Sequence, residues 1–134
     1  MGTNYYHTVK TNECAACGRH DGEPVHIGKS SAGWCFSLHV MPDEGICDLD
    51  DWRKRWEAGG EIRDEYGEVV TTEEMLRIIT ERGPGPEKVP TGYESWADFH
   101  RSNRSTHGPN GMLRHGHRST PGAGTWDLCP YSFS

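Results

Sequence analysis

The sequence predicts a small α+β domain that is stapled by zinc and contains an antiparallel sheet, two short helices and a long Gly/His-rich C-terminal loop. Three features lead to this fold class: a group of cysteines and histidines near the N-terminus, one segment that alternates between apolar and polar residues, and two capped helices. Only 33% of the 134 residues are hydrophobic, so a single domain would have a small core, and metals commonly supplement such cores.

The first feature is the pair Cys14 and Cys17, whose thiolates reach one metal ion without straining the backbone. His26 and His39 would complete a tetrahedron, which predicts a structural Zn²⁺ site with four protein ligands. The two histidines are 13 positions apart, unlike those of a standard zinc finger, and the fourth ligand therefore stays open. Two ordinary thiols or a redox dithiol are the alternative interpretations, although the turn after the pair differs from the helix start of a redox site. Further cysteines that would replace His39 are Cys35 and, more distantly, Cys47.

The second feature is the segment 34–40, which alternates with the period of a strand. A further strand is expected over residues 3–9 and a hairpin over residues 61–70. In the alternating segment, the side on which a ligand belongs would carry Cys35, Ser37 and His39. The core side would carry Trp34, Phe36, Leu38 and Val40.

The third feature is a pair of capped helices. Residues 48–56 begin with acidic side chains and continue with basic ones, which suits the helix dipole, and their apolar residues form one stripe. A second helix begins at Thr71 or Thr72, where Glu74 completes a capping box, and it ends before Gly83.

These elements divide the chain into three parts. Residues 1–82 would form a zinc-knuckle α+β core, residues 83–124 a Gly/Pro/His-rich loop or linker, and residues 125–134 a terminal strand that returns to the core. A short helical turn is expected over residues 93–99. Residues 107–124 contain almost no apolar side chains, which predicts a long loop.

Charge is unevenly distributed along the chain. Residues 1–40 are balanced, residues 41–100 carry a net charge of −9 and residues 101–134 carry +3, which gives −6 in total. A net acidic chain lacks the coherent basic face of a general nucleic-acid-binding protein, although the Arg/His-rich C-terminal part would supply a local one. No apolar run is long enough to span a membrane, and the N-terminal segment shows neither a signal-peptide pattern nor a myristoylation motif.

Two groups of residues suggest a small ligand. Lys29, Ser30 and Ser31 lie in a turn whose amide groups and lysine suit a phosphate or a nucleotide. The upstream glycine and the following helix of a phosphate-binding loop are missing, and a plain hairpin turn is the alternative. His115 and His117 would chelate a metal and belong to the same candidate ligand-binding set, unless they are ordinary polar loop residues.

A different function is suggested by the C-terminal histidines together with nearby asparagines and one of two carboxylates, namely His100, His107, His115, His117, Asn103, Asn110 and Asp98 or Asp127. Histidines with a nearby carboxylate could activate a water on a metal ion, as in nucleases of the HNH type. The spacing of His100, Asn103 and His107 is far too short for that fold, and the chain has no second cysteine pair. A metal-dependent phosphodiester hydrolase that uses the C-terminal histidines is therefore kept as the alternative function.

Four strings form a characteristic set: the opening MGTNYY, the cysteine pair, HIGKSSAGW at residues 26–34, and DEYG at residues 64–67 before a capped helix. In this set the chain resembles a group of small, uncharacterised bacteriophage proteins, over about residues 1–82 and the positions around Trp126 and Asp127. The resemblance implies a phage gene product that acts in the cytoplasm of the infected host cell and contains a metal knuckle. It implies no catalytic residue.

These features favour a non-enzymatic, zinc-stabilised binding module, a phage accessory protein that acts on a host protein or on a small nucleotide. Zn²⁺ is the expected cofactor. Neither a membrane nor a nucleic acid is the expected partner, the latter because of the net charge. The oligomeric state is left open.

Overall fold

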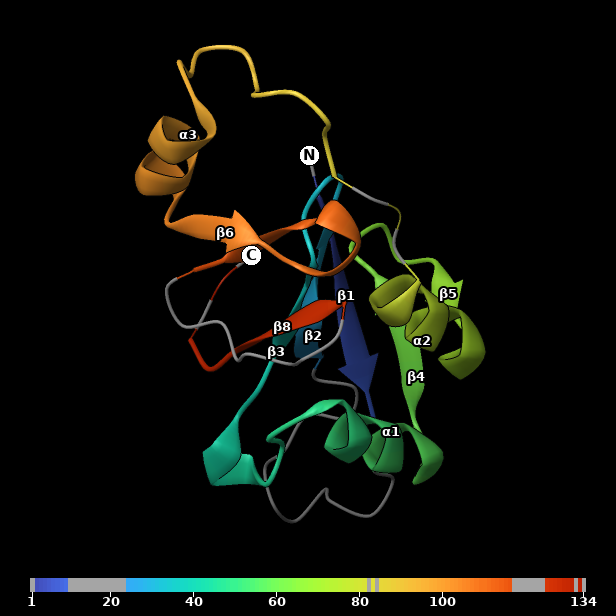
Figure 1. Ribbon diagram of the computed structural model, residues 1–134. Coiled ribbons are helices and arrows are strands. Elements are labelled where there is room, and N and C mark those ends of the chain that lie inside the picture. The colour runs from blue at the N-terminus through green and yellow to red at the C-terminus, as the bar shows by residue number, and fades with distance from the viewer. Residues whose placement is uncertain are drawn as a thin grey trace.

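The computed structural model describes residues 2–9, 24–81, 83, 85–116, 125–131 and 133. They form an α+β fold around a six-stranded sheet (Figure 1), which confirms the predicted class. The strands of this sheet are β1 (Gly2–Thr8), β2 (Val25–Ser31), β3 (Phe36–His39), β4 (Glu61–Asp64), β5 (Val69–Val70) and β8 (Trp126–Cys129). Their order in the sheet is β5-β4-β1-β2-β3-β8.

The sheet is mixed, which corrects the expectation of an antiparallel sheet. The other neighbouring strands pair antiparallel, but β8 pairs in parallel with β3, so that Phe36 lies opposite Trp126 and His39 opposite Cys129. The connection from β3 to β8 is long and contains several helices. A connection of this length imposes no hairpin geometry, so the returning strand is free to join the sheet edge in either direction.

Two helices cover one face of the sheet. These are α1 (Leu49–Glu57) and α2 (Thr72–Thr80), and both predicted helices are thereby confirmed. Asp48 caps α1 by accepting a hydrogen bond from the backbone N of Asp51 (3.0 Å), and Thr71 caps α2 by accepting one from Glu74 (3.1 Å). The apolar cluster between helices and sheet consists of Tyr5, Ile27, Phe36, Leu38, Ile46, Leu49, Trp52, Trp56, Ile62, Met75 and Ile79.

A β-bulge in β2 decides which residues reach the opposite face. The register of β1 with β2 shifts at Ile27, which is an extra residue in β2. Strict alternation would place His26 and Lys29 on opposite faces of the sheet. Because of the bulge, both lie on the face away from α1 and α2, where His26 contacts His39 and Lys29 pairs with Ser37.

The segment predicted as a loop or linker over residues 83–124 contains regular structure. It includes a further helix, α3 (Trp96–Asn103), and a hairpin of β6 (Ser105–His107) and β7 (Leu113–His115). The described residues therefore contain one α-helix more than expected, and a hairpin begins the predicted 107–124 loop, of which residues 117–124 lie outside the described part. The sparse apolar residues of this segment suffice because Phe99, Met112 and Leu113 are all buried. Short 3₁₀ helices span Pro42–Glu44 and Pro109–Gly111.

Among the described residues, no helix is both long enough and apolar enough to cross a bilayer.

Candidate functional site

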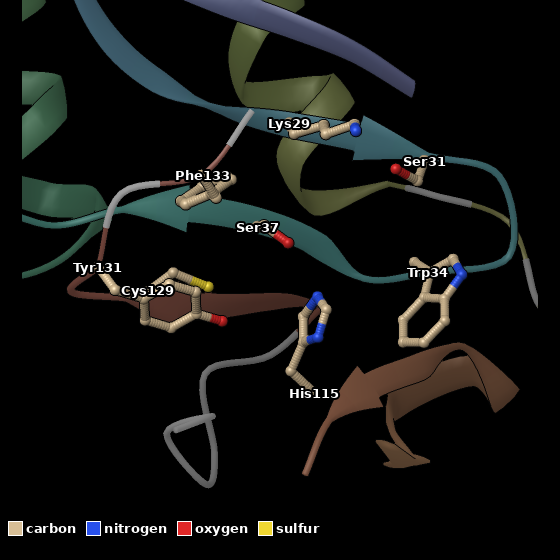
Figure 2. A pocket seen from close by; sticks show the side chains of 8 residues that line it. All are labelled: Lys29, Ser31, Trp34, Ser37, His115, Cys129, Tyr131 and Phe133. Atoms are coloured by element: carbon tan, nitrogen blue, oxygen red, sulfur yellow. The ribbon is translucent and has the colours of Figure 1, made fainter. Parts of the chain in front are cut away.

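A pocket lies on the sheet face opposite α1 and α2, where β2, β3, β7, β8 and the C-terminal residues meet (Figure 2). Its volume is about 210 Å³. Of the predicted ligand-binding residues, Lys29, Ser31 and His115 line it, Ser30 does not, and His117 lies outside the described residues. The full lining consists of Lys29, Ser31, Trp34, Ser37, His115, Cys129, Tyr131 and Phe133.

Trp34 lines the pocket, and its predicted place on the core side of the alternating segment is wrong. It precedes β3 and forms an isolated bridge with Leu113 of β7. Its indole stacks on the imidazole of His115, with ring centroids 5.1 Å apart and planes at 23°. The contact with a strand from far along the chain therefore overrides the local alternation, whereas Phe36 and Leu38, within β3, do face the core.

A buried ion pair attaches β7 to β8 beside the pocket. Nε of Arg114 donates to Oδ1 of Asp127 at 2.7 Å, and the backbone N of His115 donates to Oδ2 at 3.1 Å. Asp127 is fully buried and Arg114 is 9% exposed. Each carboxylate oxygen thus has a donor, the negative charge is compensated, and the backbone of His115 is held in position.

The pocket lining suits an anion. Lys29 supplies a positive charge and Ser31, Ser37 and Tyr131 supply hydroxyl groups, while none of the described lining residues is acidic in a chain that has 20 acidic residues. Burial raises the pKa of the Cys129 thiol, which is therefore protonated at neutral pH and a poor nucleophile. The described lining therefore suits a negatively charged group. Its cysteine is not an activated nucleophile.

Two of the four predicted zinc ligands, His26 and His39, lie side by side next to the pocket. Their ring centroids are 5.3 Å apart, and Phe133 of the pocket packs against both, at 4.8 and 5.5 Å. Nδ1 of His39 is buried and makes no hydrogen bond within the described part of the chain. Nε2 of His26 lies 2.8 Å from Oδ1 of Asn4, so a metal at that nitrogen would displace the Asn4 amide.

Burial keeps both of these histidines neutral at physiological pH. It lowers the pKa of His26 from 6.5 to about 4, assisted by electrostatic repulsion of the protonated form from His39 and Lys29 and opposed by a hydrogen bond with the Gly28 backbone. Burial also lowers the pKa of His39. Neutral imidazole is the form that ligates a metal ion, so the protonation state of the pair fits the predicted role.

Of the cysteines considered for the predicted site, the structure describes only Cys35 and Cys47. Cys14 and Cys17 lie outside the described residues. Cys35, the alternative to His39, is buried and its backbone N donates to the carbonyl of Leu113 (2.8 Å), while Cys47 is exposed. Within the described ranges, no three His, Cys, Asp or Glu side chains gather in a way that would hold a metal. The zinc site therefore stays a prediction.

Of the residues of the predicted hydrolase, His115 lines the pocket and its backbone N donates to Asp127, whereas His100 and His107 belong to a different cluster. His100 stacks on Trp96 (5.7 Å, 23°) and contacts His107 (4.8 Å). Nδ2 of Asn103 donates to the carbonyl of Phe99 at 2.9 Å, which occupies this amide within α3. The rings of His100 and His107 pack against each other and are not part of the pocket lining.

Some pocket residues were not among the predicted ligand-binding residues. For Ser37 a signal existed, because it lies on the polar side of the alternating segment. For Cys129, Tyr131 and Phe133 no signal existed, because they reach the pocket only through the parallel pairing of β8 with β3.

Comparison with models of known protein families found no match. Comparisons with curated proteins and with solved structures likewise found no similar chain. Function is therefore argued from the site itself.

Proposed function

We propose that this protein is a non-enzymatic binding module whose pocket takes a small anionic ligand of the nucleotide class. The observation that carries the proposal is the convergence of Lys29, His115 and the Trp34 ring in a pocket whose described lining is free of acidic residues. A lysine with neighbouring hydroxyl groups suits a phosphate, and flat aromatic rings suit a base.

The pocket volume limits how such a ligand would sit. Pockets that enclose a drug-sized ligand measure roughly 300–1,000 Å³. At about 210 Å³, this pocket is smaller. A nucleotide would therefore insert only its base or its phosphate, and the rest of the molecule would lie on the surface outside.

Calorimetric titration with purine and pyrimidine mononucleotides tests the proposal, with inorganic phosphate and a nucleoside as partial ligands. Replacing the pocket lysine by methionine (Lys29→Met) is expected to weaken nucleotide binding about tenfold, because one charge-assisted contact is lost. The matched control is Lys54→Met in α1, where the side chain is 71% exposed and forms a surface pair with Asp50. This control is expected to leave the affinity unchanged.

Two results would contradict the binding proposal. The first is the absence of nucleotide binding at millimolar concentration. The second is an equal loss of affinity in Lys29→Met and Lys54→Met, which would indicate an unspecific effect of net charge. Thermal melting of each variant shows whether it is folded.

We infer that Zn²⁺ stabilises the same fold through Cys14, Cys17, His26 and His39. The support is the adjacency of the two neutral histidines and the buried Nδ1 of His39. Elemental analysis of native protein is expected to find one zinc ion per chain, and His39→Ala should lower this content. The control is His107→Ala, at an exposed histidine. Metal-free protein with a native melting transition would contradict the inference.

The setting that we propose is that of a phage accessory protein in the cytoplasm of an infected cell, and the support for it is the sequence resemblance alone. A host protein is the second candidate partner. The hydrolase alternative gains nothing from the geometry, because His100 and His107 gather no third metal ligand among the described residues.

A further inference from the structure

A cluster of aromatic rings continues from the pocket over α3 and β6. We call it the aromatic strip and define it as Tyr93, Trp96, Phe99, His100 and His107. Phe99 is buried at its centre and contacts Tyr93 (4.9 Å), Trp96 (5.9 Å) and the pocket residue Trp34 (6.2 Å). Since Trp34 also stacks on His115, the ring contacts are continuous from the pocket to the strip.

The outer rings of the strip are accessible to solvent. Trp96 and His100 are half-buried and His107 is exposed. Trp96 stacks on His100 and contacts His107 at 4.9 Å, so the three rings support one another on the surface. A packed group of partly exposed rings offers faces on which planar groups can stack.

The segment that carries the aromatic strip is less acidic than the segment that contains α1 and α2. Residues 93–116 contain two acidic residues, Glu94 and Asp98, against Arg101, Arg104 and Arg114. Asp98 pairs with Arg101 (3.1 Å) and Arg114 with Asp127 (2.7 Å). Residues 43–81 contain 13 acidic and 5 basic residues, a net charge of −8. Figure 1 shows α3 and β6 at the end of the sheet opposite α1. At physiological salt, charges are screened beyond about 8 Å, which weakens the effect of more distant acidic residues on a ligand at the strip.

We propose that the nucleotide bound by the pocket belongs to a single-stranded nucleic acid whose neighbouring bases stack on the aromatic strip. This inference rests on the proposed nucleotide-binding function. The pocket encloses only one part of a nucleotide, the strip supplies the stacking platform beside it, and Arg101 and Arg104 are exposed next to the strip. Duplex bases are stacked on each other and unavailable, so the partner is a single strand.

Fluorescence anisotropy with labelled oligothymidylates and oligouridylates of two, four and eight nucleotides tests this inference, with the mononucleotide as competitor. The affinity is expected to rise at least about tenfold from the mononucleotide to the tetranucleotide, and duplex DNA should compete poorly. Trp96→Ala is expected to weaken tetranucleotide binding about tenfold and to leave mononucleotide binding unchanged. Trp96→Phe, which keeps a ring, should retain most of the affinity.

Two further variants sharpen the test. Tyr66→Ala removes a 74% exposed ring from the turn between β4 and β5, outside both the pocket lining and the strip, and is expected to change nothing. Arg104→Gln is expected to reduce the slope of log K against log salt by about 0.7, the contribution of one phosphate contact to a single strand.

The outcomes separate the two proposals. Tetranucleotide binding no tighter than that of the mononucleotide, or unaffected by Trp96→Ala in a folded variant, would overturn the single-strand inference and leave nucleotide binding in place. Binding of neither ligand would overturn both.

Discussion

The two faces of the central sheet are held by different interactions. The face toward α1 and α2 is mainly apolar, and the 11 buried side chains of its cluster are each at most 9% exposed. The opposite face contains the Arg114–Asp127 ion pair, two neutral histidines and an open pocket. Because neighbouring residues of a strand point to opposite faces, the same strands supply stability on one side and recognition on the other. Substitutions can therefore test whether the two roles are separable.

The largest effect on stability is expected when a tryptophan on each of the two faces is replaced by alanine and the two variants are compared. Trp52 is fully buried and its Nε1 donates to the carbonyl of His39 at 2.7 Å, so Trp52→Ala should lower the free energy of unfolding by about 4 kcal/mol. Trp34→Ala removes a half-buried ring and should cost about 1 kcal/mol, but it should weaken ligand binding about tenfold. Urea unfolding and calorimetry measure the two quantities. A larger loss of stability in Trp34→Ala would show that the faces are not separable.

A somewhat smaller effect is expected from the ion pair of the polar face. Asp127→Asn removes the negative charge opposite the buried Arg114 and should destabilise the fold by about 3 kcal/mol. The matched control replaces both partners, Arg114→Met with Asp127→Leu, and should recover much of this loss because no buried charge remains. Denaturant midpoints of the three proteins give the comparison. Equal destabilisation by the single and double changes would mean that the pair acts through shape alone.

The smallest effect is expected from a change of pH, which alters the stability of the fold through His7 on the apolar face. His7 is 1% exposed, and Nε2 donates to the carbonyl of Gly59 at 2.9 Å, while Nδ1 makes no hydrogen bond among the described residues. Burial lowers the pKa of His7 below 6.5. The unfolded chain therefore takes up a proton at a higher pH than the native chain, and stability should fall as the pH drops below about 6.5.

Melting temperatures between pH 7.5 and 5 measure this loss of stability. His7→Leu should show a shallower decline than the native protein, although not a flat one, because His26 and His39 contribute in the same direction. His107→Ala, at an exposed position, serves as the control and should follow the native curve. An unchanged decline in His7→Leu would assign the pH dependence to the other histidines.

Local patterns predicted those parts of the fold that depend on neighbouring residues. The caps at Asp48 and Thr71, the helices that follow them and the core side of β3 at Phe36 and Leu38 all depend on contacts within a few positions. Part of the candidate site was also accessible in this way, because Lys29 and Ser31 belong to one turn and His115 was singled out as a histidine.

The remaining site residues depend on long-range pairing. Local alternation places Trp34 on the core side, and this prediction is wrong because the bridge of Trp34 to Leu113 connects distant segments. Helix α3 was foreseen only as a helical turn, since few apolar residues mark it. The hairpin of β6 and β7 was missed because short, polar strands have no clear alternation.

The sequence by itself determined the α+β class, the two capped helices and the apolar stripe that joins them to the sheet, because these follow from side-chain spacing along one segment. Only the tertiary structure decided that the bulge at Ile27 brings His26 and Lys29 to one face and that β8 joins β3 in parallel. A bulge changes the face of every residue beyond it, and strand direction is set by where a long connection returns. Neither the bulge nor the strand direction is indicated by a local sequence pattern. The set of residues that lines the pocket therefore follows only from the tertiary structure.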